Sequence, residues 1–346
     1  MPTDTDLRER AKLLKSQLDA LYSQRDILNQ KVNDLTIQVA ANAGGAFGFQ
    51  LKQDLQAATK ERETAFNDGA IRERFLKQEL KNIDADGMYR ALLELNYTAQ
   101  TNSFESYVES QRIAAFLIHG QTGYGQDWLL RRLLEIIPDD GESEPFDPIK
   151  LDLGSTNNKS VASIWKHIAE RAGANQVPPL SNAEIAKAAA QWLETHTVVI
   201  IFRQIDAWTQ QQMDALIETF WKELVTAAQA TLKGDVDTRL LLFLVDYSDQ
   251  VSRWNLPLHD IASTQQGEPS IPVRLQDIGV FTLEFIRPWL ANPPLPYRDL
   301  FKDLRKNFEQ SVQTIMQNSQ GVPDEVARYI CYQCQLDYDP ERWLQI

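Results

Sequence analysis

Apolar residues in the first forty positions recur at alternating steps of four and three, which is the heptad repeat of a coiled-coil helix. The repeat comprises Leu7, Ala11, Leu14, Leu18, Leu21, Leu28, Val32, Leu35 and Val39. Arg25 stands at the one polar position of this series. A helix of about 38 residues would be about 57 Å long at 1.5 Å per residue.

The heptad pattern stops in Ala41–Phe49, where three glycines are expected to end the helix. A second helical pattern starts near Gln50 and continues to about Ile83, so it can return antiparallel along the first helix. We therefore predict a helical coiled-coil hairpin over residues 1–85. It either closes on itself or also binds a protein partner or a second copy of the chain. Phe47 and Phe49 at its tip are a contact site or fold back onto the hairpin.

Residues 86–292 alternate between apolar β-branched runs and helical patterns, which predicts an α/β domain. The expected strands are Ile113–His119, Ile149–Leu153, Thr197–Ile205, Arg239–Asp246 and one within Ile271–Phe285. Because these runs are apolar throughout, we expect a parallel sheet covered by helices on both faces. Pro293, Pro294 and Pro296 mark a boundary, and residues 293–346 are predicted to form a small helical lobe.

The glycines after the first expected strand have the spacing of a phosphate-binding loop, Gly-x4-Gly-Lys-Ser/Thr. Gly120 and Gly125 stand at the required interval, and Gly123 permits a positive φ. However, Gln126 replaces the lysine, and Asp127 replaces the hydroxyl residue that would bind magnesium. A carboxylate at the start of a helix competes with phosphate for the same amide donors. The sequence therefore predicts a P-loop NTPase-like fold with a degenerate loop.

The end of the third expected strand also lacks the chemistry of ATP hydrolysis. Active P-loop enzymes place acidic residues there to hold Mg²⁺ and orient water, whereas this chain has Arg203 and Gln204. Asp206 is interpreted as a cap of the helix that starts at Thr209, with a metal ligand as the alternative. Because lysine, hydroxyl and strand-end acids are replaced together, we predict no catalytic residues and no metal site.

The composition of the chain disfavours several classes of ligand and of cellular location. The 346 residues contain 35 Lys+Arg and 48 Asp+Glu, a formal net charge of −13 that opposes binding to nucleic acid. Apolar runs are too short for a membrane span and the N-terminus has no signal-peptide pattern, so a cytoplasmic protein is expected. The four histidines have no metal-ligand spacing, and Cys331 and Cys334 form a lone CxxC that we interpret as structural packing.

From about Met88 onward the chain resembles the inactive STAND proteins, degenerate relatives of signal-transduction P-loop ATPases. The resemblance rests on ALLELNYTAQ, HGQTGYGQDWLLRRL, VVIIFRQIDAW and the tripeptide Gly321-Val322-Pro323. That tripeptide is similar to the GxP turn of the family, whose proline lies against adenine in active relatives. The resemblance implies a bacterial, notably cyanobacterial, conflict system, and Gly321 and Pro323 would then form a base-binding edge.

Three functions are consistent with these observations. The first is a non-catalytic scaffold or adaptor in a signalling or defence system, with the coiled coil as its interaction module. The second is a nucleotide-binding sensor without hydrolysis, which would use the loop amides and Arg203 as a substitute cation. The third is an NTPase with a rearranged site, for which the sequence offers no nucleophile–base pair. We expect the first, with no cofactor.

Overall fold

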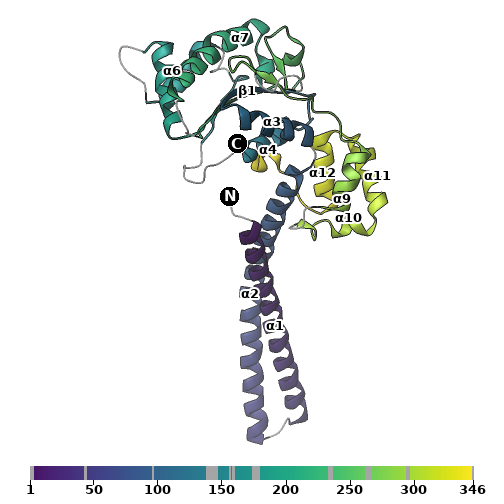
Figure 1. Cartoon of the computed structure of the whole chain (residues 1–346). Coiled ribbons are helices and arrows are strands. Elements are labelled where there is room, and N and C mark those ends of the chain that lie inside the picture. The colour runs from purple at the N-terminus through teal and green to yellow at the C-terminus, as the bar shows by residue number, and fades with distance from the viewer. Residues whose placement is uncertain are drawn as a thin grey trace. The chain divides into compact units, whose positions relative to one another are not determined.

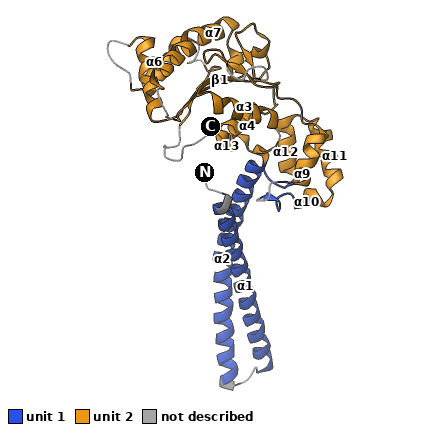
Figure 2. Cartoon of the chain, viewed as in Figure 1, with its two compact units in different colours: residues 1–91, 293–303, 334–337 blue, residues 92–292, 304–333, 338–346 orange. Residues whose placement is uncertain are grey.

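The computed structural model describes residues 4–42, 45–95, 97–137, 147–155, 157, 160–173, 180–232, 237–261, 267–293 and 297–344. These residues pack as two compact units (Figure 2). Unit 1 contains residues 1–91, 293–303 and 334–337, and unit 2 contains residues 92–292, 304–333 and 338–346. The C-terminal residues that were predicted to form one lobe are thus shared between the two units.

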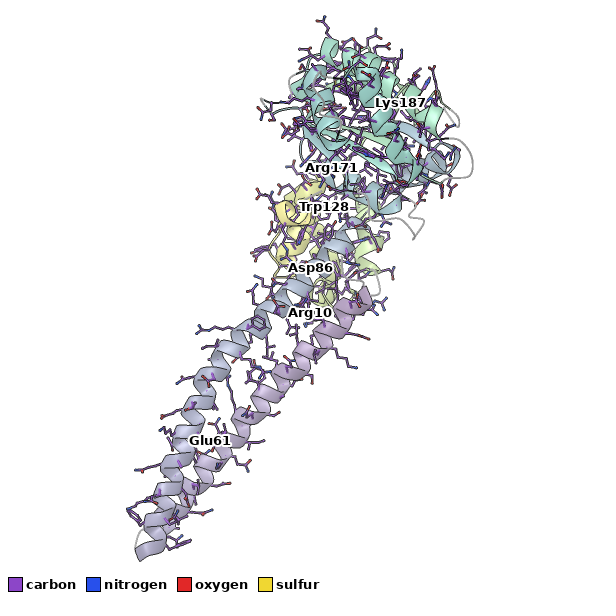
Figure 3. All side chains as sticks on the ribbon, turned by 90° about the vertical axis from the view of Figure 1, so that its left-hand side faces the viewer. Arg10, Glu61, Asp86, Trp128, Arg171 and Lys187 are labelled. Carbon is purple, nitrogen blue, oxygen red and sulfur yellow. The ribbon has the colours of Figure 1, made fainter. Side chains whose placement is uncertain are left out.

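Unit 1 is built on two long helices, α1 (Asp4–Ala41) and α2 (Gly45–Leu93). Ion pairs join Arg10 to Glu79 and Lys31 to Glu61, so the helices run antiparallel as a hairpin (Figures 1 and 3). The buried seam contains Leu7, Leu14, Leu76 and Ile83. The predicted coiled-coil hairpin is therefore present.

Arg25, the polar residue of the seam, is largely buried between the two helices. Its guanidinium donates to Glu73 at 2.6 Å and lies 5.3 Å from the centre of the Phe66 ring. Glu73 also accepts hydrogen bonds from Lys77 and Tyr22, and the bonds from Lys77 and then Arg25 lower its pKa to about 2. The polar interruption in the heptad repeat is thus matched by a carboxylate on the returning helix.

Two details of the predicted hairpin are wrong. Helix α2 begins at Gly45, inside the glycine-rich stretch, and it passes through residues 84–87 without interruption to end at Leu93. Buried Met88 and Leu92 explain the continuation, because packing of an apolar face outweighs the modest helix propensity of Asp and Gly. Phe47 and Phe49 at the tip are 64% and 65% exposed, so they do not fold back onto the hairpin.

Unit 2 contains a six-stranded parallel sheet of order β2-β3-β4-β1-β6-β5. The strands are β1 (Ile113–Ile118), β2 (Ile149–Asp152), β3 (Val198–Arg203), β4 (Leu240–Val245), β5 (His259–Asp260) and β6 (Val273–Arg274). Their registers align Ile118 with Val245 and Phe202 with Leu244, so the carboxyl ends of the central strands lie at one edge. This order, with the loop after a central strand, is a P-loop NTPase-like arrangement.

Helices cover both faces of the sheet, as its continuous apolar strands predict (Figure 1). Alternate strand residues face opposite sides. One face packs against α5 (Val161–Arg171), α6 (Asn182–Gln191), a π-helical turn (Leu216–Trp221) and α8 (Lys222–Thr231). On the other face, Phe116 contacts Phe104 of α3 (Thr98–Ser110) at 4.9 Å and stacks on Phe243 of β4 at 5.8 Å. Helix α4 (Gln126–Ile136) packs beside α3.

Local sequence fixes where several helices begin. Capping boxes pair Ser160 with Ser163 before α5, and Ser181 with Glu184 before α6. A third pairs Thr209 with Gln212 before α7 (Gln210–Ala215). The interpretation of Asp206 as this cap is therefore wrong. Asp206 instead accepts a long hydrogen bond of 3.5 Å from the backbone N–H of Tyr247.

The C-terminal part of unit 2 is helical, as predicted. It contains α9 (Leu283–Ala291), α11 (Phe308–Ser319), α12 (Pro323–Gln333) and α13 (Pro340–Trp343), while α10 (Lys302–Lys306) crosses the boundary between the units. Neither Cys331 nor Cys334 forms a disulfide, and burial raises the pKa of the Cys334 thiol to about 12. Among the described helices none is long and apolar enough to cross a membrane.

Candidate functional site

The loop that follows β1 has the backbone that its glycines predict. Gly123 and Gly125 adopt φ of 81° and 83°. Gly120 lies against Ile278, where a Cβ would come within 3.2 Å of the Ile278 Cβ. Helix α4 begins immediately after the loop. The structure therefore confirms the strand, loop and helix order that was inferred from the glycine spacing.

Gln126, at the lysine position of the loop template, is a buried structural residue. Its side chain is directed to backbone carbonyls, and its Nε2 donates to Gly120 at 2.8 Å and to Gln121 at 3.0 Å. The Asp246 carbonyl lies 3.4 Å from the same nitrogen. The residue is only 2% exposed. These carbonyls satisfy the amide donors of Gln126, so the side chain stabilises the loop and ties it to the end of β4.

Asp127, at the position of the magnesium-binding hydroxyl, accepts two side-chain hydrogen bonds. Its Oδ2 accepts from Arg203 Nη2 at 2.8 Å, and its Oδ1 accepts from the Tyr247 hydroxyl at 2.5 Å. Tyr247 in turn accepts from Arg203 Nε at 2.8 Å, which closes a ring of three hydrogen bonds. Asp127 also lies in the first turn of α4, where a negative charge is favourable. The ring joins the loop to the ends of β3 and β4.

The two strand-end positions have different roles. Arg203 is the cation of the ring, and it also lies over the Tyr247 ring at 5.7 Å. Gln204 adopts φ of 53°, and its side-chain oxygen lies over Gly154, where a Cβ would come within 2.0 Å of it. The structure therefore brings Arg203 to the loop and directs Gln204 toward the end of β2. Neither residue supplies a carboxylate for a metal.

The predicted GxP turn lies directly against the loop. Gly321 has φ of 77° and its carbonyl accepts from the Phe281 N–H at 2.7 Å. Asp324, the next residue after Pro323, donates its backbone N–H to the Gly123 carbonyl at 3.1 Å. Residues more than 200 positions apart in the sequence thus meet at one site. Whether Pro323 contacts a base stays a prediction.

The loop and α12 border a pocket of about 660 Å³ within unit 2. It is lined by Thr122, Gly123, Gly125, Gln126, Asp127, Arg203, Tyr247, Asp324, Arg328, Tyr338, Pro340, Glu341 and Leu344. Three of these residues are acidic and two are basic. Arg203 is paired with Asp127, and Arg328 lies over the Tyr338 ring at 5.6 Å. The charges that a phosphate would meet are therefore mixed.

Two titratable groups of this pocket, Asp324 and Tyr247, have raised pKa values. Burial, and then the negative charge of Asp127, raise the pKa of Asp324 to about 6. Burial, again with the charge of Asp127, also raises the pKa of the Tyr247 hydroxyl, so Tyr247 remains a hydrogen-bond donor. The raised pKa of Asp324 thus reflects first its own burial and second its repulsion by Asp127, while Arg328 acts in the opposite direction.

Several residues of the site were not found from the sequence. Tyr247 follows β4, Tyr97 precedes α3, and Asp324, Arg328 and Tyr338 come from the C-terminal helices. Tyr247 could have been found from its position, because it follows an apolar strand whose carboxyl end should lie at the same edge of the sheet as the loop. Asp324, Arg328 and Tyr338 had none, since only the packing of the C-terminal helices brings them to the loop. Tyr97 reaches the loop from the start of α3, where its hydroxyl donates to the Gly125 carbonyl at 3.3 Å.

A second cavity, of about 540 Å³, lies within unit 1 between α1, the end of α2 and residues 297–300. Apolar side chains such as Leu7 and Ile83 alternate there with Lys12, Lys15 and Asp84. Burial raises the pKa of Asp84, and Lys15 partly offsets this effect. Because its charges are mixed, this cavity has no clear preference for a ligand of either sign.

Comparisons with known proteins identify the segment that carries the loop. Residues 92–245 match the family described as iSTAND, inactive STAND. In fold, the chain resembles the structure of the Aeropyrum Pernix ORC2 protein (ADPNP-ADP complexes), with 15% identity and a TM-score of 0.41. That alignment covers 74% of this chain and 70% of the other. No curated protein matches the sequence.

The packing around Gly125 gives a prediction for stability. A Cβ at Gly125 would lie 2.2 Å from the Tyr97 hydroxyl oxygen, in addition to the cost of a positive φ. Gly173 is a matched control, because it has φ of 63° and no atom within 4 Å of an added Cβ. We expect Gly173→Ala to lower the free energy of unfolding by about 1 kcal/mol. Gly125→Ala should cost clearly more in urea denaturation, and equal costs would contradict the tight contact.

The raised pKa of Asp324 predicts a pH dependence. A carboxyl whose pKa is higher in the folded than in the unfolded state contributes stability below the unfolded pKa, and this contribution is lost as pH rises through the folded pKa. The window is therefore from the ordinary value of 3.8 to about 6. As pH rises across this window, the free energy of unfolding of Asp324→Asn should increase by up to about 3 kcal/mol relative to that of the wild type. Glu284→Gln, at an exposed position of α9, serves as the control in denaturation at several pH values.

Proposed function

We propose that this protein is a non-catalytic scaffold or adaptor, because residues 92–245 match the family described as inactive STAND. In this proposal the P-loop-like domain serves as a structural platform, and the N-terminal hairpin binds a protein partner. The setting would be a bacterial signalling or defence system, as the family resemblance implies. The observation that carries the proposal is the hydrogen-bonded ring of Asp127, Arg203 and Tyr247.

The ring engages the cation that a nucleotide phosphate would need. A phosphate is held by loop amides, a cation and a metal ion. Arg203, the cation at this edge, is bonded to Asp127 with side-chain exposures of 40% and 22%. A phosphate that recruited Arg203 would leave the Asp127 carboxylate with less compensation, beside the carboxyl of Asp324. The internal contacts thus compete with nucleotide binding.

A nucleotide sensor without hydrolysis remains the second candidate, because a pocket of about 660 Å³ adjoins the loop and Arg328 borders it. The two candidates differ in one property. A scaffold keeps the loop closed at cellular nucleotide concentrations, whereas a sensor opens the Asp127–Arg203 pair when nucleotide binds. Calorimetric titration of the full chain with Mg·ATP and Mg·ADP separates the two candidates, and we expect no heat of binding. In a separate phosphate-release assay with Mg·ATP we expect no released phosphate.

A double-mutant cycle tests the competition directly. Asp127→Thr removes the carboxylate and frees Arg203, so affinity for Mg·ATP should rise by about tenfold or more. Adding Arg203→Ala to this variant should abolish the gain. The variant Gln126→Lys with Asp127→Thr should also bind more tightly but still release no phosphate, because Arg203 and Gln204 offer no acid for metal or water. If the wild type hydrolyses ATP and Gln126→Ala abolishes this activity, the protein is an enzyme.

The hairpin presents apolar side chains that its own seam does not use. Leu13 and Ile27 are 58% and 65% exposed and stand two heptads apart on α1, so they occupy equivalent positions. Ile71 and Phe75 are 71% and 62% exposed and lie one turn apart on α2. Exposed apolar residues at helical spacing favour docking of another helix. These residues support the proposed interaction role of the hairpin.

Charge substitution on this surface tests the interaction role. Ile71→Lys with Phe75→Lys should abolish self-association in sedimentation velocity, or capture of a partner from a lysate of the source organism. Gln53→Lys, at an exposed position 18 residues earlier on α2, adds a charge away from the apolar pair and should leave the association intact. If wild type and variant are monomers at every concentration and capture the same proteins, the hairpin does not have this role.

A further inference from the structure

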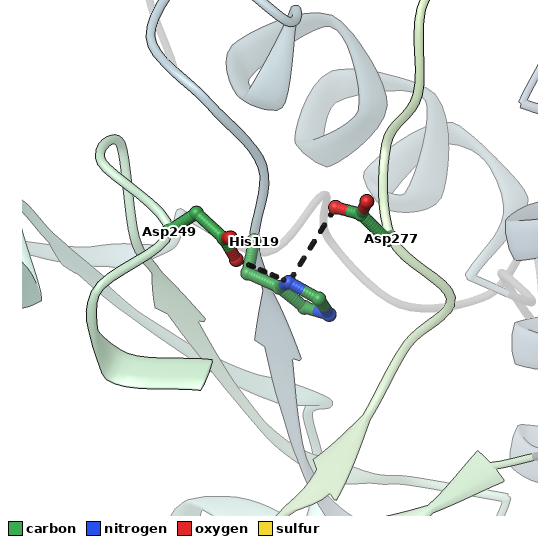
Figure 4. Close-up of side chains that lie close together, drawn as sticks. All are labelled: His119, Asp249 and Asp277. Carbon is green, nitrogen blue, oxygen red and sulfur yellow. Dashed lines mark hydrogen bonds and ion pairs between the residues drawn. The ribbon is translucent and has the colours of Figure 1, made fainter. Parts of the chain in front are cut away.

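Three side chains of the kinds that bind metal ions meet beside the P-loop, although they are far apart in the sequence. His119 immediately precedes Gly120, Asp249 follows β4, and Asp277 follows β6. One candidate ligand atom from each residue lies within 4.8 Å of the other two. Figure 4 shows the imidazole between the two carboxylates, with one aspartate on each side. All three belong to unit 2.

The hydrogen bonds of His119 determine what each ring nitrogen can do. Nε2 lies 3.1 Å from the Leu275 carbonyl oxygen, and a carbonyl only accepts, so Nε2 carries a proton. Nδ1 then faces Asp249 Oδ1 at 3.1 Å and Asp277 Oδ1 at 3.7 Å. Donation of one ring N–H to a backbone carbonyl is the arrangement that orients metal-binding histidines. Either a proton or a cation must lie between Nδ1 and the two carboxylates.

The separations of these atoms suit a small tetrahedral ion. Metal–ligand bonds of about 2.0–2.2 Å place tetrahedral ligands about 3.3–3.6 Å apart. The observed distances from Nδ1, 3.1 and 3.7 Å, lie on either side of this range. A set of one imidazole and two carboxylates is typical of first-row transition metals, whereas Mg²⁺ and Ca²⁺ prefer oxygen ligands alone. Three protein ligands leave the fourth position to water.

Burial and charge also fit a cation. His119 is 7% exposed, so its position is fixed by packing, while the Asp277 side chain is 66% exposed and can adjust. Burial opposes ionisation of Asp249, but hydrogen bonds from Ser252, Arg253 and His119 outweigh it and lower its pKa to about 2. Asp249 is therefore a carboxylate at any physiological pH. Arg253 offsets one of the two negative charges that face the imidazole.

We propose that His119, Asp249 and Asp277 bind a divalent transition metal, for which Zn²⁺ is the best fit. The ion would replace a proton on Nδ1 and tie three segments together: the start of the P-loop, the turn after β4 and the segment after β6. Backbone hydrogen bonds already join these segments, from Asp246 to Ile118 and from Leu275 to Leu117. The metal is thus a structural clamp at the loop edge, and the site is independent of the proposed scaffold role.

Titration of the full chain with Zn²⁺ and Co²⁺ after chelation tests this site. We expect one ion per chain with a Kd below about 10 μM, and a higher melting temperature when the ion is bound. Asp277→Asn should weaken binding by at least about tenfold and remove the rise in melting temperature. This side chain is largely exposed, so the variant should fold. His167→Gln, at a surface histidine of α5, is the matched control and should bind like the wild type.

Further measurements distinguish metal binding at this site from binding elsewhere in the chain and from binding of other cations. Binding should weaken as pH falls, because a proton competes with the metal for Nδ1. Excess Mg²⁺ or Ca²⁺ should not displace Co²⁺, and His119→Gln should repeat the loss seen in Asp277→Asn. The proposal is overturned if the wild type binds no Zn²⁺ in this range or if Asp277→Asn and His119→Gln bind it equally well. It is also overturned if alkylation of Cys331 and Cys334 abolishes the signal.

Discussion

The Asp127 carboxylate is the group that joins the loop to the ends of β3 and β4. It lies in the first turn of α4, where the helix favours a negative charge, and it accepts hydrogen bonds from Arg203 and Tyr247. Without it, Arg203 would lose its ion-pair partner at a half-buried position, which costs more than the pair itself contributes. Gln126 adds the second constraint by donating to carbonyls of the loop. Together, Asp127 and Gln126 give the loop hydrogen-bond partners within its own chain, and we propose that the pairing of Arg203 with Asp127 disfavours nucleotide binding.

The register of the parallel sheet brings the partners of Asp127 within hydrogen-bond distance of the loop. Strands β1, β3 and β4 are adjacent and in register, so the residues after each strand meet at one edge. Arg203 at the end of β3 and Tyr247 after β4 therefore reach α4 without any long extension of the chain. At the same edge, α12 places Asp324 against Gly123, which links the helical lobe of unit 2 to the loop.

The elements that follow from local patterns could be predicted from the sequence. The apolar runs became the strands, the heptad repeat became the hairpin, and the glycine spacing gave the loop and identified Gln126 and Asp127 as anomalies. The partners of Asp127 could not be predicted, because Arg203 and Tyr247 lie 76 and 120 residues away and their approach depends on sheet register. The His119 cluster escaped notice for the same reason. The glycine-rich tip was predicted in part, because α1 ends at Ala41 as expected, but α2 begins at Gly45 and not near Gln50.

Hydrogen exchange at the loop tests the central claim most directly, because the claim is that residues of this chain close the loop in place of a nucleotide. Exchange should be followed by mass spectrometry in peptides covering residues 118–130, with and without millimolar Mg·ATP. The account predicts identical uptake in both conditions, and faster uptake when Asp127 is replaced by Ala. Slower exchange on addition of Mg·ATP to the wild type would show that the loop binds nucleotide, and it would contradict the account.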